Sequence, residues 1–195
     1  MSHGESNPLI ASSFALLFLG KGRRPLAVSK LAYGETAQWN QHPQDLQNLV
    51  MQTEKRWDMY LTWQTMEIEL VNVADLLESP VLFISGKGSM QLTTKQKTVL
   101  QQYVNQGGFL FVENACGDAQ FDQEFRLLMK ELFPDSPLAP LAPDHALWFA
   151  DQNIPSEFVG QIHGLQTCCR TSIVSVSYTH LRAHETVLDL VCRLL

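Results

Sequence analysis

The sequence predicts an α/β domain built on a mostly parallel sheet, and three observations support that prediction. Residues 81–85 form a short, continuous apolar run, which is typical of a strand buried on both faces of a parallel sheet. An amphipathic helix pattern follows at 93–107, and a second apolar run follows at 108–113. Strand, helix and strand in this order predict a βαβ unit, in which the crossover makes the two strands parallel.

The helix of this unit has recognisable ends. Thr93 is suited to cap its first turn, and Gln96 three residues later completes a capping box. Gly107 stands where a left-handed residue commonly ends a helix. The preceding Gly86-Lys87-Gly88 lacks the spacing and the terminal Lys-Ser/Thr of a phosphate-binding loop, so a tight turn is the favoured interpretation.

Further elements extend the unit on both sides. An alternating pattern predicts a strand at 26–34, ended by Gly34. The other expected elements are a helix at about 43–57 that begins near Pro43, a strand at 66–71, a short helical turn at 73–78, a helix capped by Asp118, and a last strand within 154–175. The length of 195 residues suits one domain of this class with a substantial core.

Charge and cysteine content exclude several classes of protein. The net charge is -6, and no run of Lys or Arg occurs, so a nucleic-acid partner is not expected. The four cysteines, Cys116, Cys168, Cys169 and Cys192, show neither zinc-ligand spacing nor a disulfide framework. We therefore expect no metal and no cofactor.

Both ends of the chain differ from the central region. Residues 8–20 are apolar but short for a bilayer span, and positive charge follows them rather than preceding them as in a signal peptide. The alternatives are an export signal with a misassigned start, a membrane anchor through residues 8–20, or a buried strand or helix. We therefore divide the chain into an N-terminal segment at 1–25, the α/β domain at 26–175 and a tail at 176–195.

The tail at 176–195 resembles a translated sequencing-library adapter. The fixed stretches VSYTHLRAHET and LVCRLL flank a few variable residues. The alternative is an amphipathic C-terminal helix, because Val187, Leu190, Val191 and Leu194 have helical spacing. The adapter interpretation is favoured, and it predicts a domain truncated near Ser175 whose sheet has an uncovered edge.

Several short motifs in order and spacing resemble one bacterial family. The matching stretches are Lys30–Gly34 with Trp39-Asn40, Leu82–Gly86, Gly107–Asn114, Cys116-Gly117, Phe133-Pro134, Pro143–Leu147 and Cys169–Ser172. Together they resemble domain-of-unknown-function family 4159 (DUF4159), which is itself similar to ThuA-like and class I glutamine amidotransferase-like domains. Lys87 and Ala146 depart from this pattern, which usually has histidine and proline there.

The resemblance implies a three-layer, flavodoxin-like α/β sandwich without a known activity, and it favours the bacterial envelope or periplasm over the cytoplasm. In amidotransferase-like domains a nucleophilic cysteine follows a strand and precedes a helix, as Cys116 does here. A thiol nucleophile needs a base, and His145 beside Asp144 is the candidate. The G-x-C-x-G sequence that surrounds the cysteine of amidotransferase-like domains is incomplete around Cys116, however. Packing at a tight turn is the alternative role for this residue.

Polar residues are expected to gather at the carboxyl edge of the sheet, where open α/β sheets bind ligands. The candidate ligand-binding residues are Trp39, Asn40, Gly86, Glu113, Asn114 and Asp144. For Trp39 a cover over the core is an equally good interpretation, and Glu113, Asn114 and Asp144 can also serve as caps or solvated groups. The preferred prediction is binding of a polar small molecule, with carbohydrate as an example. The alternatives are a Cys116-dependent hydrolase or amidotransferase-like enzyme, and an interaction module of the envelope.

Overall fold

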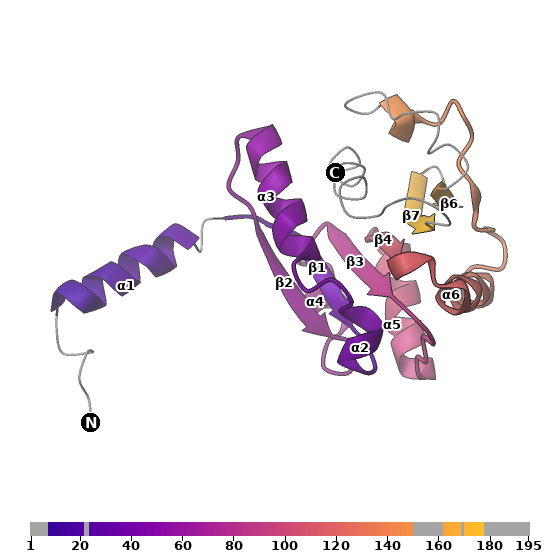
Figure 1. The fold of residues 1–195 in the computed structure, drawn as a ribbon, viewed down its shortest axis with the longest axis horizontal. Coiled ribbons are helices and arrows are strands. Elements are labelled where there is room, and N and C mark those ends of the chain that lie inside the picture. Colours follow the sequence, from indigo (N-terminus) through magenta and orange to yellow (C-terminus); the bar gives the residue numbers. More distant parts are fainter. Residues whose placement is uncertain (1–7, 22–23, 150–161, 169, 178–195) are drawn as a thin grey trace.

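A computed structural model describes residues 8–21, 24–149, 162–168 and 170–177 (Figure 1). Within these residues a single sheet has the strand order β2-β1-β3-β4-β7-β6-β5. The strands are β1 (Leu26–Ala32), β2 (Thr62–Glu67), β3 (Val81–Gly86), β4 (Phe109–Asn114), β5 (Ala139–Pro140), β6 (Ile162–Thr167) and β7 (Arg170–Ser177). Strands β2, β1, β3, β4 and β7 are parallel, while β6 runs antiparallel to β7 and β5 runs antiparallel to β6.

Helices lie on both faces of the sheet. Leu46 and Leu49 of α3 pack with Val28, Phe83 and other residues on one face. The second face carries the larger core cluster, which includes buried residues of α4, α5 and α6. The helices and 3-10 turns are α1 (Pro8–Lys21), α2 (Thr36–Trp39), α3 (Asp45–Trp57), α4 (Val73–Leu76), α5 (Thr94–Asn105), η1 (Ala115–Gly117), α6 (Ala119–Leu132) and η2 (Ala146–Phe149). The expected layered α/β fold is therefore confirmed.

The structure confirms the central βαβ unit and its helix ends. β3, α5 and β4 follow one another, and β3 pairs with β4 in parallel. The Thr93 N–H donates to Gln96 Oε1 at 2.8 Å, and the Gln96 N–H donates to Thr93 Oγ1 at 3.3 Å, which completes the capping box. Gly107 has a φ of 109°, a conformation that favours glycine.

The strand expected at 66–71 has different bounds in the structure. β2 begins at Thr62 and ends at Glu67, and its side chains alternate between half-buried and exposed. Among the described strands it lies at the edge of the sheet and pairs with β1, so it lacks the continuous apolar run of a central strand. Asp58, with a φ of 49°, ends α3 in the left-handed conformation before this strand.

The last part of the sheet is a hairpin that the sequence pattern did not predict in full. The expected strand is β7, but β6 lies beside it and pairs Thr167 with Arg170 across the turn. β6 thus covers the edge of β7. β7 continues through Val176 and Ser177, the first residues of the adapter-like stretch, whereas residues 178–195 lie outside the described part. The origin of that stretch stays a prediction.

The N-terminal apolar stretch forms α1, which projects away from the sheet (Figure 1). No helix in the described part of the chain is both long enough and apolar enough to cross a membrane.

Candidate functional site

One face of the sheet changes from apolar to polar toward the carboxyl ends of its strands. Near the amino ends, Val28 of β1 pairs with Val81 of β3, and both are buried. Two residues further along β1, the same face carries Lys30 instead of an apolar side chain. In the neighbouring strands, Ser85 of β3 aligns with Glu113 of β4. All three polar residues are buried, which is costly unless their charges and hydrogen bonds are compensated.

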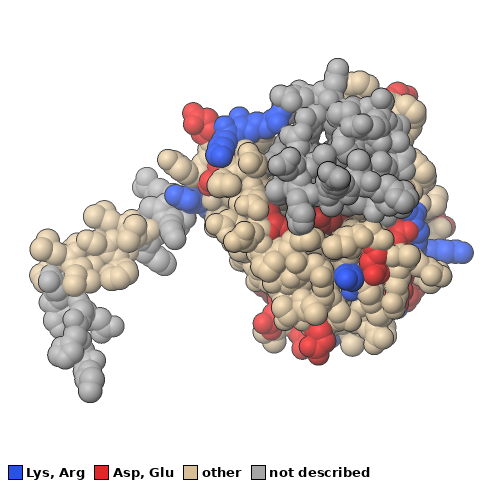
Figure 2. Space-filling model, viewed as in Figure 1, with Lys and Arg blue, Asp and Glu red and all other residues tan. Residues whose placement is uncertain are grey.

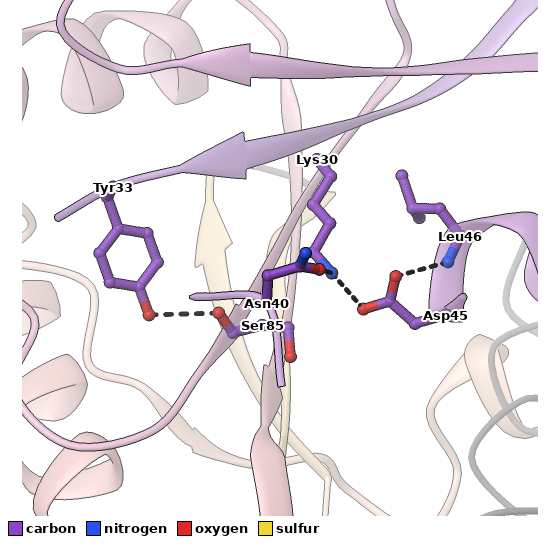
Figure 3. A network of polar contacts seen from close by, with 6 residues as sticks. All are labelled: Lys30, Tyr33, Asn40, Asp45, Leu46 and Ser85. Carbon is purple, nitrogen blue, oxygen red and sulfur yellow. Dashed lines mark hydrogen bonds and ion pairs between the residues drawn. The ribbon is translucent and has the colours of Figure 1, made fainter. Parts of the chain in front are cut away.

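Lys30 is the centre of this polar layer and is only 2% exposed. Its Nζ donates to Asp45 Oδ2 at 2.5 Å and to Asn40 Oδ1 at 3.0 Å (Figure 3). The same nitrogen lies 5.5 Å from the ring centroid of Trp39, within the range of a cation–π contact. Lys30 therefore joins strand β1 to the segment after α2 and to the first turn of α3.

Asp45 is held in a position that suits a carboxylate. It is the first residue of α3, where the helix dipole favours negative charge, and the Leu46 N–H donates to its Oδ1 at 2.6 Å (Figure 3). The two carboxylate oxygens of Asp45 thus interact with different partners, the helix backbone and Lys30.

Glu113 is a buried carboxyl group next to this ion pair, and its pKa is raised from 4.5 to about 7. Burial is the main cause, because it disfavours the charged form, and the negative charge of Asp45 adds to the rise. The Ser85 hydroxyl and the Lys30 ammonium oppose it. Near neutral pH the Glu113 carboxyl is therefore divided between its acid and carboxylate forms.

A thiol and an imidazole lie close together beside this polar layer. Cys116 follows Glu113 by three residues, and His42 precedes Asp45 by three. The Cys116 Sγ lies 3.9 Å from His42 Nε2, and Cys116 is exposed. With φ 59° and ψ 17°, Cys116 has a left-handed conformation that is uncommon for a residue other than glycine. Such backbone strain concentrates at functional sites.

The structure places the histidine expected to act as base in another hydrogen-bond environment. His145 Nε2 lies 2.8 Å from Thr171 Oγ1, and its Nδ1 accepts from the Leu147 N–H at 3.2 Å. Both ring nitrogens of His145 thus have partners on η2 and β7. Asp144 is exposed. The histidine that contacts Cys116 is instead His42.

The other candidate ligand-binding residues differ in accessibility. Trp39 and Asn40 are half-buried, and Trp39 also packs against the larger core cluster. Asn114 is 2% exposed at the end of β4. Gly86 is buried, and a Cβ there would lie 1.9 Å from Phe121 and 2.3 Å from the Tyr33 hydroxyl. The structure therefore gives Gly86 a packing role.

The turn after Gly86 is held by neighbouring loops. The Gly88 N–H donates to Asp118 Oδ1 at 3.1 Å, and the Lys87 N–H donates to Gln38 O at 2.9 Å. Because these backbone donors are used within the chain, the geometry agrees with a tight turn rather than a phosphate cradle. Asp118 also accepts from the Phe121 N–H at 2.8 Å, and these bonds lower the pKa of its carboxyl group. It therefore caps α6 as expected.

The sequence patterns assigned no site role to Lys30, Asp45 or His42, although His42 follows the first predicted strand beside Trp39 and Asn40. The available signal was Lys30, a charged residue within the otherwise apolar strand pattern of 26–32. Asp45 carries no such signal, and the partner of His42 could not be predicted, because both contacts depend on how the segment after β1 folds over the sheet. Within the described residues, no group of three His, Cys, Asp or Glu side chains is arranged to hold a metal ion.

The parallel sheet, the helices on both faces and the polar carboxyl edge define a flavodoxin-like α/β domain. A family model described as Domain of unknown function (DUF4159) matches residues 27–185, and the chain belongs to this family. A putative ThuA-like protein from Bacteroides uniformis has a similar structure, with a TM-score of 0.51 and 10% identity over 88% of this chain and 91% of that one. This similarity shows the fold.

A Megasphaera elsdenii flavodoxin in its two-electron reduced form also matches, with a TM-score of 0.35 and 13% identity over 54% of this chain and 77% of the flavodoxin. No curated protein matches the chain in sequence.

Proposed function

We propose that this domain binds a polar small molecule at the carboxyl edge of β1, β3 and β4. The observation that carries the proposal is the polar layer of buried Lys30 and Glu113 with half-buried Asp45, beside exposed Cys116 and half-buried Asn40. Charged groups are buried at a cost, and a cluster with a perturbed pKa at the end of a parallel sheet is typical of a binding or catalytic site.

A ligand with several hydroxyl groups, such as a carbohydrate, suits the groups at this edge. The Asn40 amide N–H groups can donate to hydroxyls, half-buried Trp39 can offer an edge of its ring, and buried Glu113 lies behind them. Lys30 and Asp45 neutralise one another, so they add polarity without a strong preference for one sign of charge.

Titration with a neutral monosaccharide, followed by backbone amide NMR, tests this function. We expect D-glucose or N-acetylglucosamine to shift signals of residues 39–45 and 113–118, and Asn40→Ala to weaken binding by about 1 kcal/mol, the value of one hydrogen bond. Asn105→Ala makes the same change at the exposed end of α5 and serves as the control. Absence of shifts with either sugar, or equal weakening by both substitutions, would contradict a carbohydrate site.

A second candidate function is supported by the contact between Cys116 and His42. In a thiol hydrolase, His42 Nε2 would accept the Cys116 proton, and the thiolate would form a bond to a substrate carbonyl carbon. The bond from that carbon to nitrogen or oxygen would break, and the leaving group would take the proton from His42. Water would then hydrolyse the thioester and regenerate the thiol.

The rate of alkylation by iodoacetamide at each cysteine tests this second function. We expect Cys116 to be alkylated faster than Cys168 at pH 7, and His42→Gln to remove this difference. Exposed Cys168 in the same chain is an internal control, and His145→Gln tests the other histidine. If Cys116 and Cys168 have the same pH profile, the hydrolase assignment fails while sugar binding is unaffected.

A further inference from the structure

A cavity lies at the amino ends of β1 and β3, beneath the C-terminal half of α3. Its volume is about 220 Å³, and its walls include Val28 of β1, Val81 of β3, and Val50 and Trp57 of α3. Protein interiors are normally close-packed, with few voids larger than a water molecule. Space of this size within the layered fold is therefore unusual, and it is large enough for a small organic molecule.

The walls of the cavity are apolar. Thr53 is the polar side chain among them, and its hydroxyl donates to Leu49 O at 2.9 Å within α3. The backbone N–H of Leu61, another wall residue, donates to Glu54 Oε1 at 2.8 Å. A buried water molecule needs about two to four polar partners, so these walls hold water poorly and suit an apolar ligand.

Trp57 and Pro80 form the rim of the cavity. The side chain of Trp57, the last residue of α3, is 44% exposed, and Pro80 is exposed as well. Val28, Val50 and Val81 are buried behind them. A ligand can therefore enter past the Trp57 ring without unfolding of the domain and contact apolar side chains from both the sheet and the helix.

The charges near the rim compensate one another. Arg24 Nη1 lies 3.8 Å from Glu54 Oε1, and the Arg24 guanidinium lies 4.7 Å from the centroid of the Tyr60 ring. Basic and acidic side chains lie together around the C-terminal end of α3 (Figure 2). Because Arg24 already has these partners, it is not available to hold the head group of an anionic ligand. The surroundings of the cavity thus favour an uncharged molecule.

We propose that this cavity binds a small, uncharged, apolar molecule of the size of one aromatic ring with a short alkyl substituent. An apolar cavity of about 150 Å³ can hold benzene, and the larger volume here leaves room for the substituent. Transfer of the molecule from water to the apolar walls provides the driving force. The polar site proposed above lies at the carboxyl ends of the same strands, so the two proposals are independent.

Titration of the full chain with toluene, followed by backbone amide NMR, tests the inference. We expect saturable shifts of the signals of residues 27–28, 50–57 and 81–82, with the signals of 39–45 and 113–118 unchanged. Benzoate has the same ring with a negative charge and should bind at least about tenfold more weakly, because its carboxylate loses its hydration among apolar side chains.

A variant that fills the cavity tests its location. Ala27→Leu adds apolar bulk to the wall and should weaken toluene binding at least about tenfold, because the new side chain occupies the space of the ligand. Ala74→Leu makes the same change at an exposed position of α4 and should leave binding unchanged. Circular dichroism shows whether both variants are folded. If Ala27→Leu does not fold, Val50→Phe fills the cavity from α3 and should have the same effect.

Three outcomes would overturn the proposal. The unaltered chain could show no saturable shifts with toluene, which decides the matter whether or not the variants fold. Toluene and benzoate could bind with equal affinity, or the filled variant and Ala74→Leu could weaken binding equally. In each of these cases the cavity is not a site for an uncharged apolar molecule.

Discussion

The Lys30 ammonium group lies 2.5 Å from the Asp45 carboxylate and joins the central part of β1 to the first turn of α3. The side chains are 3% and 11% exposed, respectively, so the ion pair is nearly excluded from water. A pair of this kind is weak evidence for stability when intact, but the loss of one partner leaves an uncompensated charge. This pair also holds Asn40 at the edge where we propose a ligand.

Lys30→Met should therefore lower the free energy of unfolding by about 3–5 kcal/mol, the cost of breaking a buried pair. Urea denaturation measures the change. Lys97→Met is the control, because the Lys97–Glu131 pair has a similar distance of 2.6 Å but is more exposed, and its loss should matter by about 1 kcal/mol at most. The double variant Lys30→Met/Asp45→Leu should recover much of the loss. Equal effects at Lys30 and Lys97 would contradict the buried pair.

Glu113 should make the domain less stable as pH rises from about 4.5 to about 7. The folded state raises the pKa of this carboxyl group to about 7, so the folded chain binds more protons than the unfolded chain within that range. The expected loss is on the order of 3 kcal/mol, at 1.36 kcal/mol per pKa unit.

Unfolding by urea at pH 5 and at pH 8 measures the Glu113 effect. Glu113→Gln should remove this loss, whereas exposed Glu69→Gln should keep it. If Glu113→Gln and the unaltered chain show the same change in stability between the two pH values, Glu113 does not have the raised pKa.

Gly86→Ala should destabilise the domain by about 3 kcal/mol or more, because the new Cβ overlaps the Phe121 ring and the Tyr33 hydroxyl. Gly88→Ala tests backbone strain alone, since Gly88 has a φ of 72° with open space around its Cβ position. That substitution should cost about 1 kcal/mol. Thermal unfolding compares the two, and a smaller effect at Gly86 than at Gly88 would argue against close packing.

Cys116→Gly should stabilise the domain by about 1 kcal/mol, because glycine adopts the left-handed conformation of this residue without strain. Cys116→Ala keeps the strain and should change stability little. Denaturant unfolding distinguishes the two. If glycine and alanine behave alike, Cys116 is not strained.

The sequence patterns predicted those features that depend on neighbouring residues along the chain. The apolar run at 81–85, the capping box of Thr93 and Gln96, and Gly107 were sufficient for the βαβ unit. Cap formation and helical periodicity are local, so they can be recognised without knowledge of the fold. The motifs from Lys30 to Ser172 indicated the family, which the match over 27–185 shows.

The tertiary structure decided which side chains meet. β1 and β4 are separated by β3 in the sheet, and the segment after β1 brings His42 to Cys116 across 74 positions of sequence. The same segment brings Asp45 to Lys30 and thereby shapes the surroundings of Glu113. Contacts between distant residues depend on strand order and on loop conformation, neither of which a periodic pattern encodes. For this reason the sequence alone determined the α/β class and placed Cys116 after a strand, while only the folded chain selected its histidine.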